Sequence, residues 1–191
     1  DWGVHLLDYA LIGMKATVPK SISAMGGNFA DPASAQETPD TMTALYQFDD
    51  FNLQWEHTIG IEGGMNKTSH GIAYIGEHGT LALDRSGWEV MEEPKSDKKA
   101  KVERRKQSDN GLDKHMENFV SVIRSRKMQE LACSIEEASH IAVLSQMGNI
   151  AFRSGNKLDW DKQKGRFTDE RINKKYLAAA YHNGYKLPVI G

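Results

Sequence analysis

The chain has 191 residues, of which 39% are hydrophobic and 26% charged, and a formal net charge of -2 at pH 7. This composition is typical of one soluble globular domain, and a chain of this length buries about 70% of its unfolded surface. The near-neutral charge disfavours a general attraction to nucleic acid or anionic membranes. The single cysteine, Cys133, excludes a disulfide framework and a multi-cysteine metal site, and no run of about 18 apolar residues predicts a membrane span.

The first predicted element is a helix over residues 2–14. Val4, Leu7 and Leu11 recur at positions i, i+3 and i+7, which places them on one face of this helix. The sequence starts at Asp1 without an initiator methionine and already in a helical pattern. We therefore expect it to be a fragment of a longer protein.

Short runs of alternating apolar and polar residues follow and predict β-strands. The expected strands cover residues 21–25, 41–48, 51–61, 71–76, 80–84 and 88–92. In the second and third runs, the residues that share a face are Met42, Ala44, Tyr46 and Phe48, and then Phe51, Leu53, Trp55, His57 and Ile59. Because the connections are short, we expect antiparallel pairing, since parallel strands need long crossovers.

The segment over residues 94–110 is strongly basic, with lysines and arginines that outnumber its acidic residues. A charge run of this length is typical of a solvated loop or an extended hairpin arm. No aromatic residue is interleaved for base stacking, so the segment does not favour nucleic-acid binding.

The last third of the chain has helical spacing of its apolar residues. Ser134 and Glu137 match a capping box, in which the two side chains satisfy free amide donors of the first turn. The expected helices cover residues 112–123, 135–151 and 169–182, the last capped by Thr168, with residues 159–161 in a connector.

This order of elements predicts an α+β fold, with an open and mostly antiparallel sheet covered on one face by helices. We expect residues 1–191 to form one domain, with the basic arm at about 94–110. No glycine-rich turn joins a buried strand to a helix, so the chain lacks the fingerprint of a dinucleotide-binding Rossmann domain. We therefore expect no cofactor to be held by this chain.

The richest group of chemically active residues lies at the start of the chain. Asp1, His5 and Asp8 stand at i, i+4 and i+7 and would line one face of the first helix. A histidine flanked by carboxylates can act as a general acid/base, because a carboxylate fixes the tautomer and stabilises the imidazolium. The spacing alone favours a simpler interpretation, in which Asp1 is a first-turn acid and His5 a satisfied surface group. Two turns of helix rarely hold a metal without other ligands, so we expect no metal site.

Two further residues are candidates for substrate binding. Asp8 lies on the same face as His5, and His57 shares a strand face with Trp55, where it could line a polar pocket or an interface. The other histidines are scattered, and a structural role is expected for each of them.

Several short motifs, taken in chain order, resemble those of one known family. They are Asp1-Trp2-Gly3-Val4-His5-Leu6-Leu7-Asp8, Gly76-Glu77-His78-Gly79-Thr80-Leu81, His115-Met116-Glu117-Asn118-Phe119 with Ile123-Arg124-Ser125, Met147-Gly148-Asn149-Ile150-Ala151-Phe152-Arg153, and Leu158-Asp159-Trp160-Asp161. They cover nearly the whole chain and look like the D-x-G-x-H-x-x-D, G-x-x-G-T-L, H-x-x-N-F, L-G-N-I-A-x-R and L-x-W-D motifs of the glucose–fructose oxidoreductase, inositol dehydrogenase and rhizopine-catabolism (Gfo/Idh/MocA) family.

The resemblance implies a two-domain parent protein. Its N-terminal Rossmann domain would bind NAD or NADP, and this chain would be the C-terminal domain for substrate binding and oligomerisation, forming a homodimer or tetramer through its sheet. His5 would be the acid/base that acts on a sugar, inositol or related polyol, and Asp1 would orient it and share its proton. The lysine of the family's E-K-P motif is absent from this chain, so we expect the chain alone to be inactive.

Two alternatives stay open. The same family includes NAD-dependent glycosidases, which cleave glycosidic bonds through transient oxidation. A non-catalytic dimerisation or interaction domain would instead use an exposed sheet face that carries Tyr46 and Trp55. The cytoplasm is the default expectation for location, and export of the parent protein would fit equally well.

Overall fold

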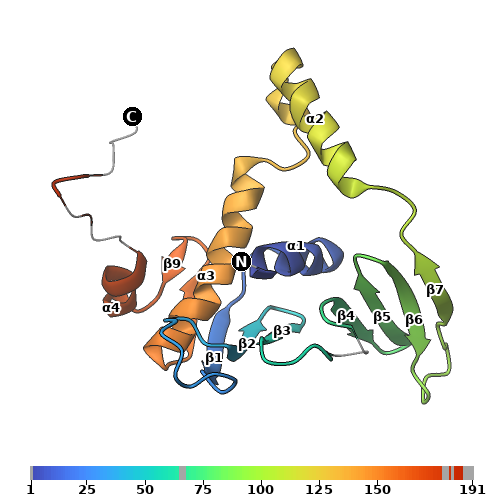
Figure 1. Cartoon of the computed structure of the whole chain (residues 1–191), viewed down its shortest axis with the longest axis horizontal. Helices are drawn as coiled ribbons and strands as arrows, with labels where there is room; N and C mark the ends of the chain where they lie inside the picture. The colour runs from blue at the N-terminus through green and yellow to red at the C-terminus, as the bar shows by residue number, and fades with distance from the viewer. Residues whose placement is uncertain (1, 65–67, 178–180, 182, 187–191) are drawn as a thin grey trace.

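The computed structural model describes residues 2–64, 68–177, 181 and 183–186, and contains two antiparallel sheets with helices beside them (Figure 1). The five-stranded sheet has the order β3-β2-β1-β8-β9 and is built from β1 (Ser21–Gly27), β2 (Thr41–Gln47), β3 (Asn52–Thr58), β8 (Leu158–Asp161) and β9 (Arg166–Phe167). The four-stranded sheet has the order β4-β5-β6-β7 and is built from β4 (Ile72–Gly76), β5 (Gly79–Asp84), β6 (Gly87–Glu92) and β7 (Val102–Lys106).

The main helices are α1 (Trp2–Met14), α2 (Gly111–Ser125) and α3 (Ile135–Ser154). Shorter helical turns are η2 (Met128–Glu130), α4 (Glu170–Ile172) and η3 (Asn173–Leu177). The predicted α+β class with antiparallel strands is confirmed, and the strands divide between two sheets. Within the described ranges, every helix lacks the combination of length and hydropathy that a bilayer-crossing segment requires.

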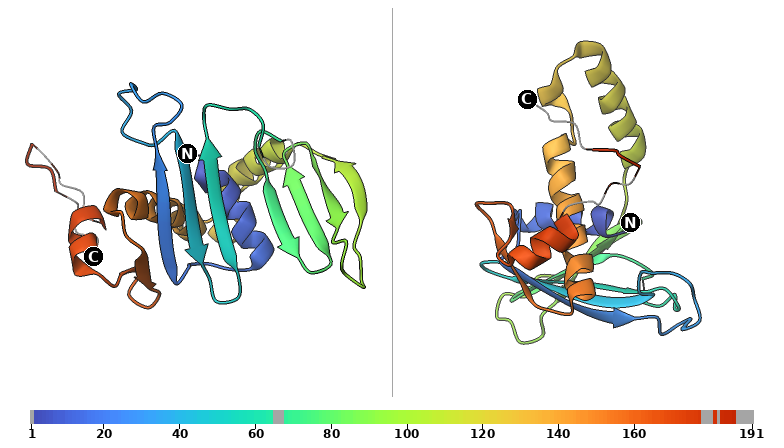
Figure 2. Two further views of the ribbon diagram at one scale, coloured as in Figure 1. Left: turned by 90° about the horizontal axis from the view of Figure 1, so that it is seen from below. Right: turned by 90° about the vertical axis from the view of Figure 1, so that its left-hand side faces the viewer.

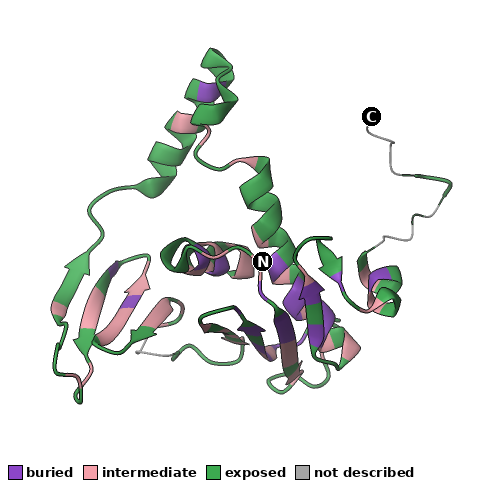
Figure 3. Ribbon diagram, turned by 180° about the vertical axis from the view of Figure 1, so that it is seen from behind, coloured by how far each residue is buried: buried purple, intermediate pink, exposed green. Residues whose placement is uncertain are grey.

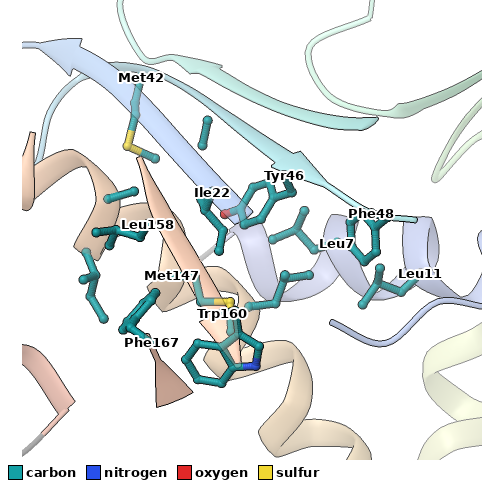
Figure 4. Packing of buried hydrophobic residues seen from close by; sticks show 14 residues of the cluster. Leu7, Leu11, Ile22, Met42, Tyr46, Phe48, Met147, Leu158, Trp160 and Phe167 are labelled. Atoms are coloured by element: carbon teal, nitrogen blue, oxygen red, sulfur yellow. The ribbon is translucent and has the colours of Figure 1, made fainter. Parts of the chain in front are cut away.

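The largest core lies between one face of the five-stranded sheet and helices α1 and α3 (Figure 4). Ile22, Ala44 and Tyr46 from the sheet are buried against the helices, which contribute residues such as Leu7 and Met147. Each large apolar side chain buried in this way stabilises the fold by roughly 1.5–3 kcal/mol. The core therefore fixes α1 against the sheet.

The face that carries Tyr46 is the one this core covers, and this corrects the expectation of an exposed interface there. Tyr46 is 1% exposed, and Trp55 on the same face is partly buried. Alternation correctly predicted that Met42, Ala44 and Tyr46 share a face. It could not predict that α3 packs on that face, because the contact joins segments far apart in sequence.

The segment expected to be a connector forms β8, which corrects that prediction. Leu158 pairs with Ile22 of β1, and the ring of Trp160 meets the ring of Phe167 edge-on at 5.0 Å. Leu158 and Trp160 are buried while Asp159 between them is exposed. The strand has only four residues, too few for its alternation to stand out in the sequence.

The last helix starts one residue later than predicted. The side chain of Asp169, not Thr168, accepts a hydrogen bond from the backbone N–H of Arg171 and caps α4. Residues 178–180 and 182, which fall in the predicted helix, lie outside the described residues.

The four-stranded sheet contacts α1 through Tyr74 on β4. The Tyr74 hydroxyl donates a hydrogen bond to the carbonyl of Tyr9, and its ring lies against Gly13, where a side chain would collide with it. Helix α1 therefore contacts both sheets and lies where segments from each can reach its side chains.

The basic segment contributes β7, which pairs with β6 to form a hairpin arm. Arg104 contacts Asp84 at 2.8 Å and Glu89 at 3.5 Å, and Lys101 contacts Glu103 at 2.9 Å. Acidic side chains of the same sheet therefore balance part of its positive charge.

Candidate functional site

His5 is presented to solvent because the opposite face of α1 is anchored in the core. Leu7 and Leu11 are 3% and 4% exposed, whereas His5 is exposed and Asp8 is partly buried. The structure thus brings two of the predicted site residues, His5 and Asp8, together on α1. Asp1 lies outside the described residues, so its orientation of His5 stays a prediction.

Asp8 lies where α1 approaches the first turn of α3. Burial raises the pKa of the Asp8 carboxyl, and the Glu137 carboxylate raises it further, while His5 acts in the opposite direction. A raised pKa favours the protonated form. Asp8 can therefore donate a hydrogen bond at a higher pH than an ordinary aspartate, which suits contact with a substrate oxygen.

Three side chains gather around the ring of Trp2 at the start of α1. The ring of His5 lies 6.1 Å from it in an edge-on arrangement, and the ring of His70 lies 5.1 Å away. The guanidinium of Arg85 lies over the indole, 5.0 Å from the ring centre, in cation–π geometry. The Trp2 cluster, formed by Trp2, His5, His70 and Arg85, therefore joins α1, the loop before β4 and the β5–β6 turn.

His70 brings a free polar atom to the Trp2 cluster. Its Nδ1 contacts the Ser69 hydroxyl at 3.1 Å, and its Nε2 is buried without a hydrogen-bond partner among the described residues. A buried ring nitrogen without a partner is costly, so a group supplied from outside this part of the chain would satisfy it.

Arg85 is placed by a tight turn that Asp84 holds together. The Asp84 carboxylate accepts hydrogen bonds from the Ser86 backbone at 2.6 Å and hydroxyl at 2.7 Å, from Gly87 at 3.1 Å, and from Arg104 at 2.8 Å. Gly87 has a φ of 154°, and a side chain there would collide with the carbonyl of Arg105. The turn therefore fixes the backbone from which Arg85 reaches Trp2.

Replacing Asp84 with asparagine should destabilise the protein and loosen this turn. Hydrogen bonds from Ser86, opposed by burial and aided by Arg104, lower the pKa of Asp84 from 3.8 to about 2. A lowered pKa contributes stability above pH 4 that is lost as the pH falls toward 2. We expect Asp84→Asn to cost roughly 1–2 kcal/mol at pH 7 and to flatten the pH dependence between pH 4 and 2. Urea unfolding at several pH values measures the free energy of unfolding. If it fell equally steeply between pH 4 and 2 for both proteins, the prediction would be contradicted.

His57 makes its described contacts elsewhere, within the five-stranded sheet. Its Nδ1 accepts a hydrogen bond from the Trp55 indole at 3.1 Å, and its Nε2 lies 3.0 Å from the carbonyl of Pro39. Both ring nitrogens therefore have hydrogen-bond partners, with the proton on Nε2, and this indicates a structural role for His57. The structure does not bring His57 to the Trp2 cluster.

The sequence did not single out Trp2, His70 or Arg85 as site residues. The sequence predicts a structural role for His70 and gives no signal for Arg85. No spacing could have revealed them, because they meet only when the two sheets pack beside α1. Over the described ranges, no group of three or more histidine, cysteine or acidic side chains is arranged to hold a metal ion.

The Trp2 cluster and Asp8 combine an aromatic face, a cation, two imidazoles and a carboxyl group. Indole rings offer an apolar surface, guanidinium and imidazole groups donate hydrogen bonds, and an exposed imidazole can exchange protons. These side chains can bind an oxygen-rich small molecule and move a proton on one of its oxygens.

The fold is similar to that of solved oxidoreductases. A protein from Klebsiella pneumoniae described as a putative oxidoreductase is 12% identical and has a TM-score of 0.58 over 90% of this chain and 51% of its own. A protein from Bacillus subtilis described as a putative oxidoreductase is 13% identical, with a TM-score of 0.61 over 84% of this chain and 52% of its own. An aldose-aldose oxidoreductase from Caulobacter crescentus, solved with glycerol, is 14% identical, with a TM-score of 0.59 over 83% of this chain and 46% of its own.

These likenesses are likenesses of fold. The chain spans about half the length of the solved structures it matches. No protein-family model matches the chain, and no curated protein does. The chain therefore has the fold of a domain that occurs in oxidoreductases.

Proposed function

We propose that the chain is the substrate-binding domain of an NAD(P)-dependent oxidoreductase of the Gfo/Idh/MocA type, acting on a sugar, inositol or related polyol. The observation that carries this proposal is the exposed His5 imidazole beside Trp2, on a helix fixed by the core. The fold of solved oxidoreductases and the order of the sequence motifs support it.

In this proposal each residue of the Trp2 cluster has a role suited to a polyol. The Trp2 ring packs against the apolar face of the substrate, and the exposed Arg85 guanidinium hydrogen-bonds to its oxygens. The ring of His70 packs beside Trp2 and holds the indole in place. His5 accepts the proton of the reacting hydroxyl as the C–O bond becomes a carbonyl. Asp8 binds the substrate, and Asp1 orients His5.

Oxidation of the same carbon also needs a hydride acceptor, which a nicotinamide cofactor held outside this chain would supply. The described residues do not fit a nicotinamide dinucleotide, since their sheets are antiparallel and offer no βαβ unit with a phosphate-binding turn. The cofactor is therefore assigned to a preceding domain, and this chain supplies the groups that bind substrate and move its proton.

The oligomerisation role belongs to the outer face of the five-stranded sheet, opposite the core. Met25 on β1 and Leu45 on β2 are 76% and 47% exposed there. Ser23 pairs with Leu45 and Thr43 with Met25, so the two apolar side chains are diagonal neighbours on that face. A homodimer or tetramer would cover them.

The full-length protein, incubated with NAD or NADP and a panel of polyols, should form reduced nicotinamide, and the chain alone should not. Turnover of a nitrophenyl glycoside without net nicotinamide reduction would favour the glycosidase alternative. No turnover of either substrate class by a folded, cofactor-loaded protein would contradict the oxidoreductase proposal.

A further inference from the structure

Helix α2 carries an apolar stripe that the described part of the chain leaves uncovered. Leu112, Met116, Phe119 and Ile123 are 67%, 50%, 47% and 45% exposed. They recur at i, i+4, i+7 and i+11, so they lie along one side of the helix over three turns. Figure 3 shows α2 projecting from the body of the fold with almost its whole surface exposed.

The neighbouring side of α2 is already occupied. The Asn118 amide donates a hydrogen bond to the carbonyl of Glu130 at 2.8 Å and accepts one from the backbone of Ala132 at 2.9 Å. Val122, one turn on, is 4% exposed. These contacts fasten α2 to the turn that leads into α3, so the orientation of the helix relative to that turn is set and its apolar stripe faces away from the turn.

The apolar stripe is as large as many functional patches but small for a dimer. Four half-exposed side chains present on the order of 300–400 Å² of apolar surface, which is in the range of the largest patch on a typical monomer, a patch that is often functional. A stable dimer buries about 800 Å² on each partner, which exceeds this stripe. A domain tethered in the same polypeptide needs less area, because the connection keeps its effective concentration high.

We propose that the apolar stripe of α2 docks the domain that precedes α1 in the same polypeptide, an inference that rests on the proposed two-domain protein. Solved structures with this fold are about twice as long as the part they share with the chain. The start of α1 and the projecting α2 lie on the same side of the sheets (Figures 1 and 2). A domain joined to α1 therefore reaches the stripe, and α2 helps to hold it above the Trp2 cluster.

Photo-crosslinking tests which molecule covers the stripe. The full-length protein would carry a benzophenone analogue of phenylalanine at position 119, and, as the matched control, at Ser121 on another side of α2, where the side chain is also exposed. We expect crosslinks from position 119 to peptides that precede Asp1, within a single polypeptide, and few from position 121. Crosslinks that join two copies, or equal yields at both positions, would overturn the proposal.

Replacing Phe119 with aspartate in the full-length protein should release α2 from its partner. We expect at least a tenfold faster hydrogen exchange of α2 amides than in the parent protein, with unchanged exchange in a Ser121→Asp control. Equal exchange in both variants, or a halved molar mass for Phe119→Asp by light scattering, would contradict it. Exchange and crosslinking need no turnover, so an inactive protein with these results would count against the oxidoreductase proposal alone.

Discussion

Replacing His5 with glutamine in the full-length protein should lower kcat/KM for polyol oxidation roughly 10²–10⁴-fold. This is the range for loss of a positioned general acid or base, and a glutamine amide cannot take up a proton near neutral pH. His5 is exposed. The ring contact described for it is an edge-on contact with Trp2, and the two ring centres are 6.1 Å apart. We therefore expect the Tm to stay unchanged. Steady-state kinetics and thermal melting measure the two effects.

His78→Gln is the matched control for this experiment. His78 is also exposed, but it lies in the β4–β5 turn, where its Nδ1 contacts the Ser96 hydroxyl at 2.9 Å. Its replacement should leave kcat/KM within about twofold of the parent value, since surface substitutions away from a site have small effects. A loss below tenfold for His5→Gln, or an equal loss for both variants, would contradict the acid/base role.

Replacing Gly148 with alanine should destabilise the chain by roughly 1–3 kcal/mol, the usual cost of overfilling a packed core. A Cβ at this position would collide with the hydroxyl of Tyr46 and would meet the Ala44 side chain at 3.6 Å. Tyr46 is 1% exposed and cannot move aside without opening the core. Burial raises the pKa of its hydroxyl, which therefore stays protonated and bonded to the Gly148 backbone. Urea denaturation measures the loss.

Tyr46→Phe provides the partner variant, because it removes the oxygen that an alanine would strike. In the Tyr46→Phe background, Gly148→Ala should cost less than about 1 kcal/mol, so the two substitutions should not be additive. Equal costs of Gly148→Ala in the two backgrounds would show that this collision is not what the glycine avoids.

Much of the secondary structure follows from periodicity, because alternation and helical spacing record which side chains are buried. Leu7 and Leu11 correctly marked the buried face of α1, and Met42, Ala44 and Tyr46 that of β2. The division into two sheets did not follow. One sheet ends at β3 and the other begins at β4, while β1 pairs with β8 across most of the chain, and local patterns carry no information about which strands pair.

Periodicity also overestimated burial in places. Met116 on α2 has the spacing of a core residue yet is half exposed, and Met25 on β1 is 76% exposed. Apolar spacing predicts that a side chain has a partner, but it does not say whether that partner lies in the same domain.

The sequence likewise predicts some residues of the candidate site and misses others. His5 and Asp8 were predicted, because residues one turn apart on a helix share a face. The partners of Trp2 were not, since His70 and Arg85 come from a loop and a turn that reach α1 only through tertiary packing. Gly148 belongs to a segment that resembles the L-G-N-I-A-x-R motif, and its close contact with Tyr46 gives a physical reason for a glycine at this position.

The measurement that most directly tests the two-domain oxidoreductase is to sequence the reading frame upstream of the codon for Asp1. We expect it to encode a strand, a glycine-rich turn and a helix within a βαβ unit, together with an E-K-P motif. A start codon immediately before Asp1 would contradict this. The chain would then be a free-standing binding or scaffold domain, with no catalytic role for His5.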